Sequence, residues 1–337
     1  MTANPISPFY RSEIKDNKPL SLFTRGKVSG VVIHPLSFFF FSCFIFLFYG
    51  CSAEPVPQKG VRVLVTVAPV AGLVKNVAGD LIPVTVLVPA GKEPETFMPT
   101  PSEMLEIAGC TLFFRVGLSS EDAVLERLKS INPNLRIVDL RDNLPVLNFD
   151  EGISDGAKDE ELEGEETGEG GEDHHHHHGE SDPHIWMSLQ NLSLMAEMVS
   201  WVLSEEDAEN RGIYTARSAE FQKKADVLHQ EITERLNDIP SRTIFVFHPA
   251  YGWYCHEFNL KQRAVESGGK SPKSKDLVNL IRRLEEERAE KIFVQPEFSR
   301  SAADKIAESL HIQVEVHSPL EEDPFSNISG LTEAILR

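Results

Sequence analysis

Residues 208–239 have the sequence AENRGIYTARSAEFQKKADVLHQEITERLNDI. Apolar side chains recur in it at spacings of four and three, which is the periodicity of one face of an α-helix. These side chains are Phe221, Ala225, Leu228, Ile232, Leu236 and Ile239. Pro240 ends the pattern. A helix of this length could be an ordinary surface helix, but it lies between two strand-rich regions. We therefore predict a helix over 208–239 that joins two lobes.

Strand and helix patterns alternate on both sides of this helix. The strand patterns before it lie at 61–67, 84–88, 111–116 and 136–140, with helical patterns at 70–78 and 121–130. Those after it lie at 243–247, 262–265, 291–295 and 312–316, with helical patterns at 276–287 and, last in the chain, 302–310. Short apolar strands that alternate with helices are typical of a parallel sheet covered on both faces. We predict an α/β fold with two lobes, 61–207 and 240–337, each with a parallel sheet of roughly four strands.

An acidic, glycine-rich segment interrupts the first lobe at residues 149–181. From Glu151 to Asp182 the chain has thirteen carboxylates against one basic residue, Lys158. With few apolar side chains it cannot bury enough surface to offset its chain entropy, so we expect disorder. It ends in the consecutive histidines His174, His175, His176, His177 and His178. We interpret these as an accessory metal-collecting loop, the alternative being a solvated charge run.

Composition excludes some partners. The net charge is -19, from 52 acidic and 33 basic side chains, which argues against nucleic acid and suits a protein that handles cations. The four cysteines do not form a disulfide framework. Cys110 and Cys255 each stand in an apolar context, and we expect two buried free thiols, although the sequence leaves a bridge between them open.

The N-terminal residues have the features of an export signal. The apolar run 36–49 is shorter than the ~20 residues of a membrane span and fits the core of a secretory signal. It ends at Gly50-Cys51, which resembles a bacterial lipoprotein signal with Cys51 as the lipidated residue. We expect residues 1–52 to be leader and signal and 53–60 a tether, the alternative being an uncleaved anchor.

Four side chains are candidate metal ligands. His184 follows the acidic segment and precedes apolar Ile185, while His248 and His317 come directly after predicted strands. Glu95 lies in the loop after strand 84–88. Ligands of open α/β sheets bind beyond the carboxyl ends of the strands, so we expect these side chains to meet between the lobes. Imidazoles with a carboxylate suit Zn²⁺, whereas manganese prefers more oxygen.

Five segments resemble one protein family in the same order along the chain. They are GKEPETFMPTPSE (91–103), DPHIW (182–186), FVFHPAYGW (245–253), QPEFS (295–299) and SPL (318–320). They resemble the metal-binding lipoproteins of bacterial ABC importers, the ZnuA-like zinc and manganese receptors, over about residues 61–330. The resemblance implies two lobes bridged by a long helix, metal in the cleft, and a histidine-rich loop before the second ligand.

Two positions depart from this family. The first segment normally carries a histidine where this chain has Glu95, and the last normally carries an aspartate where it has Ser318. The resemblance therefore transfers only His184 and His248 directly. Glu95 is expected to be an oxygen ligand, and the fourth donor stays open between His317, Ser318, water and a histidine of the loop.

The resemblance implies a function without catalysis. We predict a monomeric, membrane-anchored lipoprotein of the periplasm or extracytoplasmic face that captures Zn²⁺ as its transported ligand and delivers it to an ABC permease and its ATPase. The alternatives are transport of manganese, a metal-buffering or adhesin-type surface lipoprotein, and a secreted zinc hydrolase. The sequence contains no His-Glu-x-x-His motif for a hydrolase of that type.

Overall fold

The computed structural model describes residues 60–142, 144–147, 181–264, 274–298 and 300–337. The chain divides into two units, 1–58 and 59–337, and all described residues belong to the second. The predictions for the leader, Cys51, the tether and the five loop histidines fall outside the described residues, apart from Gly60 and Ser181 at their margins. No helix in the described ranges is long and apolar enough to cross a membrane.

The first sheet has four parallel strands in the order β2-β1-β3-β4. The strands are β1 (Val63–Val65), β2 (Val84–Val86), β3 (Leu112–Arg115) and β4 (Arg136–Asp139). The central strands β1 and β3 are almost wholly buried, as expected for a parallel sheet with helices on both faces. This confirms the predicted strands: β2 and β4 begin at the predicted residue, and every other strand end lies one or two residues inside the sequence pattern.

The second sheet repeats this topology in the order β6-β5-β7-β8, again all parallel. Its strands are β5 (Thr243–Val246), β6 (Lys261–Ala264), β7 (Lys291–Val294) and β8 (Gln313–Val316). The chain order reverses between β5 and β7, as it does between β1 and β3. Such reversal points are where loops diverge and ligands bind in open α/β sheets. The predicted two-sheet architecture is confirmed.

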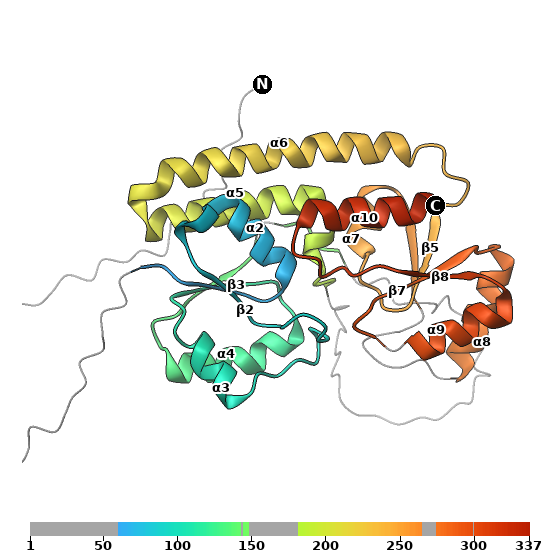
Figure 1. Cartoon of the computed structure of the whole chain (residues 1–337), viewed down its shortest axis with the longest axis horizontal. Helices are drawn as coiled ribbons and strands as arrows, with labels where there is room; N and C mark the ends of the chain where they lie inside the picture. Colours follow the sequence, from blue (N-terminus) through green and yellow to red (C-terminus); the bar gives the residue numbers. More distant parts are fainter. Residues whose placement is uncertain (1–59, 143, 148–180, 265–273, 299) are drawn as a thin grey trace, which may run out of the picture. The chain divides into compact units, whose positions relative to one another are not determined.

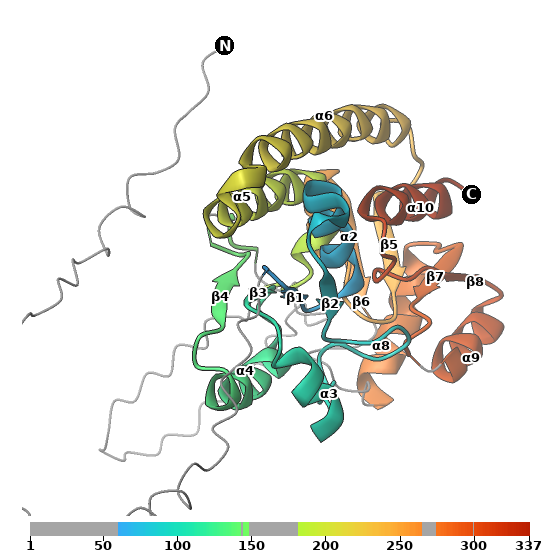
Figure 2. The same ribbon diagram turned by 60° about the vertical axis from the view of Figure 1, so that its left-hand side comes forward.

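The long helix is α6 (Arg211–Arg235), preceded by the short 3₁₀ helix η5 (Ala208–Asn210). It packs along α5 (Leu189–Glu206) and contacts α2 (Ala68–Ala78) and α10 (Pro324–Leu336). In Figures 1 and 2, α6 lies on the outer side of α5, across the helices of both lobes. Of its predicted face, Phe221, Ala225 and Ile232 are buried. The prediction is confirmed, although the helix ends four residues before the expected end.

The remaining helices include three that the sequence patterns did not predict. The predicted ones are α4 (Ser119–Ile131), α8 (Ser274–Glu286) and α9 (Arg300–Leu310). The unpredicted ones are α3 (Pro101–Ile107), α7 (Gly252–Glu257) and α10, together with the 3₁₀ helices η3 (Gly79–Leu81) and η4 (Ile185–Met187). The expectation that 302–310 is the last helix is wrong. The Asp323 side chain accepts hydrogen bonds from the backbone N–H groups of Phe325 and Ser326, and this cap starts α10.

One hydrophobic core joins the two sheets on the side of the long helices. It contains Val65 of β1, Phe221 of α6 and Val246 of β5. The opposite faces of the two sheets have separate cores, around Phe113 in the first lobe and Ile292 in the second. Cys110 and Cys255 are both buried thiols that are not joined in a disulfide, as predicted. The shared core ties the lobes together behind the edge at which the candidate ligands lie.

Candidate metal centre

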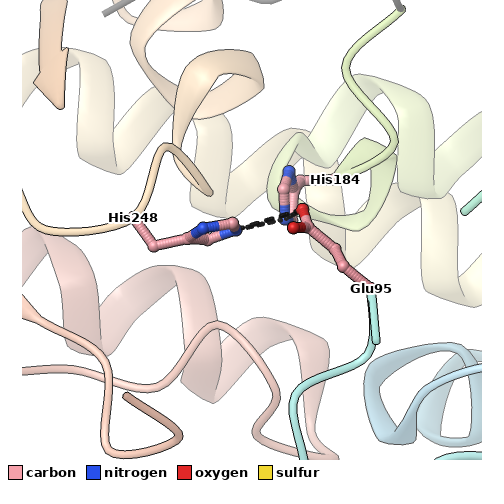
Figure 3. A group of neighbouring side chains, drawn as sticks. All are labelled: Glu95, His184 and His248. Atoms are coloured by element: carbon pink, nitrogen blue, oxygen red, sulfur yellow. Dashed lines mark hydrogen bonds and ion pairs between the residues drawn. The ribbon is translucent and has the colours of Figure 1, made fainter. Parts of the chain in front are cut away.

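Glu95, His184 and His248 come together from three distant parts of the chain. Their candidate ligand atoms all lie within 4.8 Å of one another. Nε2 of His248 lies 3.4 Å from Nε2 of His184 and 3.3 Å from Oε1 of Glu95. The third distance, from Nε2 of His184 to Oε1 of Glu95, is 4.0 Å. Figure 3 shows all three side chains pointing toward one another.

These spacings fit a small tetrahedral ion. Zinc binds imidazole nitrogen and carboxylate oxygen at about 2.0–2.1 Å, so neighbouring ligands of a tetrahedral ion lie about 3.3–3.4 Å apart. Two of the three distances between donor atoms match this ligand–ligand separation, at 3.4 and 3.3 Å. The third distance is longer, at 4.0 Å. Nitrogen and oxygen donors in this arrangement can hold zinc or another divalent transition metal.

A buried carboxylate orients His184. Nδ1 of His184 lies 2.8 Å from Oδ1 of Asp182, and the backbone N–H of His184 donates to the same oxygen at 2.9 Å. Because a carboxylate oxygen accepts, Nδ1 donates to Asp182, and in the neutral imidazole that binds a metal the lone pair of Nε2 faces Glu95 and His248. Trp253 donates its indole N–H to the backbone carbonyl of Asp182 at 3.0 Å. The segment before η4 is therefore fixed from the second lobe.

The turn after β7 holds His248 in place. The backbone N–H of His248 donates to the side-chain oxygen of Gln295 at 3.2 Å, and the Gln295 amide donates to the His248 carbonyl at 2.8 Å. Phe298 stacks its ring on the imidazole, with centroids 4.7 Å apart. His248 comes two residues after β5, rather than directly after it as predicted, because β5 ends at Val246.

Glu95 comes from the long loop between β2 and α3. The Ser120 hydroxyl anchors this loop by donating to the carbonyl of Pro94 at 2.8 Å. Burial alone would raise the pKa of Glu95, but the hydrogen bond with His248 and the charges of His248 and His184 lower it by more. The pKa therefore lies below its ordinary value of 4.5, and the side chain is an anionic oxygen donor near neutral pH.

The other two predicted candidates lie outside this group. His317 turns toward α10, with Nε2 3.0 Å from the carbonyl oxygen of Asn327 and Nδ1 3.2 Å from the hydroxyl of Tyr251. Its burial lowers its pKa from the ordinary value of 6.5, which outweighs the opposing effect of the Asn327 carbonyl. The hydroxyl of Ser318 donates to Oε1 of Glu297 at 2.7 Å.

Sequence reasoning missed Glu297, which lines the same cavity as Glu95, His184 and His248. The cavity is small, about 20 Å³, and residues of both lobes form its walls. The signal that could have found Glu297 is its position just beyond the carboxyl end of β7. The same rule had selected His248 and Glu95.

The chain is similar to known proteins over most of its length. The family model described as zinc-uptake complex component A, periplasmic, matches residues 63–331. The metal ABC transporter substrate-binding lipoprotein of Lactococcus lactis subsp. lactis is 26% identical over 267 residues, covering 77% of this chain and 80% of the relative. The manganese ABC transporter substrate-binding lipoprotein PsaA of Streptococcus mitis is 24% identical over 247 residues, covering 70% and 72%.

A solved structure agrees with the family model and with the two relatives. The crystal structure of ZnuA superposes with a TM-score of 0.71 and 27% identity, covering 82% of this chain and 98% of that one. The family match spans well over half of the chain. The chain therefore belongs to the ZnuA family, the metal-binding substrate-binding proteins of ABC importers, which are not enzymes.

Proposed function

We propose that this protein captures Zn²⁺ at Glu95, His184 and His248 and releases it to the permease of an ABC importer. Substrate-binding proteins of these importers work with a permease and an ATPase. The main support for this site is the spacing of the three donor atoms. The Nε2 atoms of His184 and His248 lie 3.4 Å apart, and Oε1 of Glu95 lies 3.3 Å from Nε2 of His248. Asp182 supports it by directing the lone pair of His184 into the group.

Manganese is the second candidate ion. The oxygen donor Glu95 favours it, because carboxylate ligands suit manganese better than imidazole does. The relative from Streptococcus mitis is named for manganese, whereas the family model is named for zinc uptake. We favour zinc because two of the three grouped donors are imidazole nitrogens.

The protein holds its ion between lobes that share one core. Because Val65, Phe221 and Val246 belong to the same hydrophobic cluster, a wide hinge opening would expose apolar surface at a cost of about 25 cal/mol per Å². We therefore propose that local rearrangement of the ligand-bearing loops admits and releases the ion. The lobe limits 61–207 and 240–337, with a joining helix, follow the two sheets and belong to this proposal.

The remaining features complete the proposal. The protein would be a monomer, anchored at the extracytoplasmic face through Cys51, with His174–His178 as an accessory loop that raises the local zinc concentration. The relatives named above are described as lipoproteins of ABC importers, which supports the anchor. A metal-buffering or adhesin-type role would use the same site without delivery to a permease.

Growth under zinc limitation tests delivery. Cells that lack this protein should grow slowly when zinc is chelated and recover when the wild-type gene is returned. The variant His184→Ala should fail to restore growth, whereas His256→Ala, which removes an exposed histidine of α7, should restore it. Full recovery with His184→Ala would contradict delivery from this site. Manganese limitation in parallel distinguishes the two ions.

A further inference from the structure

Glu297 lies at the tip of a tight turn beyond β7. The backbone N–H of Phe298 donates to the carbonyl of Gln295 at 3.1 Å, which closes a turn with Pro296 and Glu297 at its two central positions. In the second sheet, β5 and β7 flank the point where the chain order reverses. His248 follows β5 and Glu297 follows β7, so both side chains start from the place where open α/β sheets bind ligands.

This turn is attached to His248 at both of its ends. Gln295 is fully buried and exchanges two hydrogen bonds with the backbone of His248. Phe298 stacks on the imidazole of His248. Glu297 stands between these two contacts, so its backbone is held close to a proposed metal ligand.

Only one of the two carboxylate oxygens of Glu297 has a hydrogen-bond partner in the described part of the chain. Oε1 accepts the hydroxyl proton of Ser318 at 2.7 Å, and the same hydroxyl oxygen accepts from the backbone N–H of Leu320 at 3.2 Å. Oε2 is buried and has no hydrogen-bond partner in the described part of the chain. A buried carboxylate oxygen without a partner is unfavourable, and a cation in the adjoining cavity would remove that cost.

We propose that Oε2 of Glu297 is the fourth donor to the metal ion, and that Ser318 is the residue that positions it. The proposal rests on the proposed function, because it adds a donor to the site of Glu95, His184 and His248. The ion would then have two nitrogen and two carboxylate oxygen donors. Glu297 is not among the donors that all lie within 4.8 Å of one another, so its carboxylate must move inward when the ion binds.

This arrangement assigns a role to the serine at position 318. A serine hydroxyl is a poor zinc ligand compared with a carboxylate. By donating to Oε1 it holds the carboxylate beside the cavity that Glu297 lines and leaves Oε2 without a partner, as partners of metal-binding carboxylates commonly do. The negative charge that an aspartate at position 318 would supply comes instead from Glu297, across the hydrogen bond from Ser318.

Zinc affinity of the full exported protein, measured against a competing chelator, tests the proposal. Glu297→Gln keeps the shape of the side chain and removes its charge, and it should weaken zinc binding about 10- to 100-fold. Ser318→Ala should weaken binding several-fold, and Ser318→Thr should restore it because the hydroxyl returns. The double variant Glu297→Gln/Ser318→Ala should bind zinc no more weakly than Glu297→Gln alone. Glu290→Gln, at an exposed position of the same lobe, controls for the lost charge.

Two further measurements separate ligation from a structural role. The absorption spectrum of bound Co²⁺ should change in Glu297→Gln, because a donor is replaced. The metal-free variant should unfold at the same temperature as wild type or higher, because a buried unpaired charge is gone.

Unchanged zinc affinity and Co²⁺ spectrum in Glu297→Gln, with binding lost in His184→Ala, would overturn this inference alone. Wild-type binding in both variants would overturn the proposed site as well. A metal-free Glu297→Gln protein that unfolds earlier and binds zinc normally would show a structural role and would also overturn the inference.

Discussion

Nδ1 of His184 and Oδ1 of Asp182 lie 2.8 Å apart, and this pair determines which nitrogen of His184 faces the metal site. The carboxylate accepts the Nδ1 proton and thereby orients the ring, so that Nε2 faces Glu95 and His248. Both side chains are almost fully buried, so the pair is shielded from solvent.

Asp182→Asn should weaken zinc binding about 10- to 100-fold, because the amide no longer fixes the tautomer of His184 with a negative charge. The measurement is zinc affinity by chelator competition. Asp226→Asn, at an exposed position of α6, is the control for charge and should bind as wild type does. Equal affinities in all three proteins would contradict the orienting role of Asp182.

Glu95→His should shift selectivity toward zinc. The substitution places a third imidazole in the group, and imidazole suits zinc better than manganese. We expect the ratio of zinc affinity to manganese affinity to rise by about 10-fold, since a change in one donor is worth about 1.4 kcal/mol or more. Competition between the two ions, followed by metal analysis of the protein, measures the ratio. An unchanged ratio would show that the side chain at position 95 is not a metal ligand.

His317→Gln should leave zinc affinity unchanged, because both ring nitrogens of His317 lie against Asn327 and Tyr251 rather than in the donor group. A large loss of affinity would restore His317 as the fourth donor. The zinc affinity of this variant therefore shows whether His317, rather than Glu297, is the fourth metal donor.

The same variant should alter the pH dependence of stability. The pKa of His317 is lowered by burial from 6.5, so the unfolded chain binds this proton more readily than the folded protein does. The resulting stability is present above pH 6.5 and is lost as the pH falls below it. Thermal unfolding of the metal-free protein between pH 7.5 and about 5 should show a smaller decrease in His317→Gln than in wild type. An identical decrease would contradict a proton uptake at His317.

Gly72→Ala should destabilise the protein by about 1–3 kcal/mol, as overpacking at a close contact does. A Cβ at position 72 of α2 would lie 1.8 Å from the carbonyl oxygen of Glu322, just before α10. Gly212→Ala, in the first turn of α6 where a Cβ meets nothing within 4 Å, should be neutral or stabilising by up to about 1 kcal/mol. Chemical unfolding measures both. Equal stability of the two variants would contradict the docking of α10 on α2.

Much of the fold could be predicted because each signal was periodic or local. The apolar spacing at Phe221, Ala225 and Ile232 indicated α6, and the alternation of apolar runs with helices indicated two parallel sheets. The helices that were missed are short, as α3 and α7 are, or depend on a capping residue and a packing partner, as α10 does with Asp323 and α2.

The site could be predicted only to the level of position along the chain. The rule that ligands lie beyond strand ends selected Glu95, His248 and His317 alike. It could not show that His317 turns toward Asn327 of α10, because that helix was not predicted. Nor could it show that Ser318 binds Glu297, since that contact joins two loops that are distant in sequence.

Zinc calorimetry on the exported body without the acidic loop separates the buried site from the five histidines. The backbone N–H of Asp182 donates to the carbonyl of Leu147 at 2.8 Å, so the two ends of the loop lie side by side and a short glycine linker can replace residues 149–180. We predict one tight zinc site per chain in this protein and its loss in the His184→Ala/His248→Ala double variant. Absence of tight binding after loop removal, or its survival in the double variant, would contradict the assignment of Glu95, His184 and His248 as the metal site.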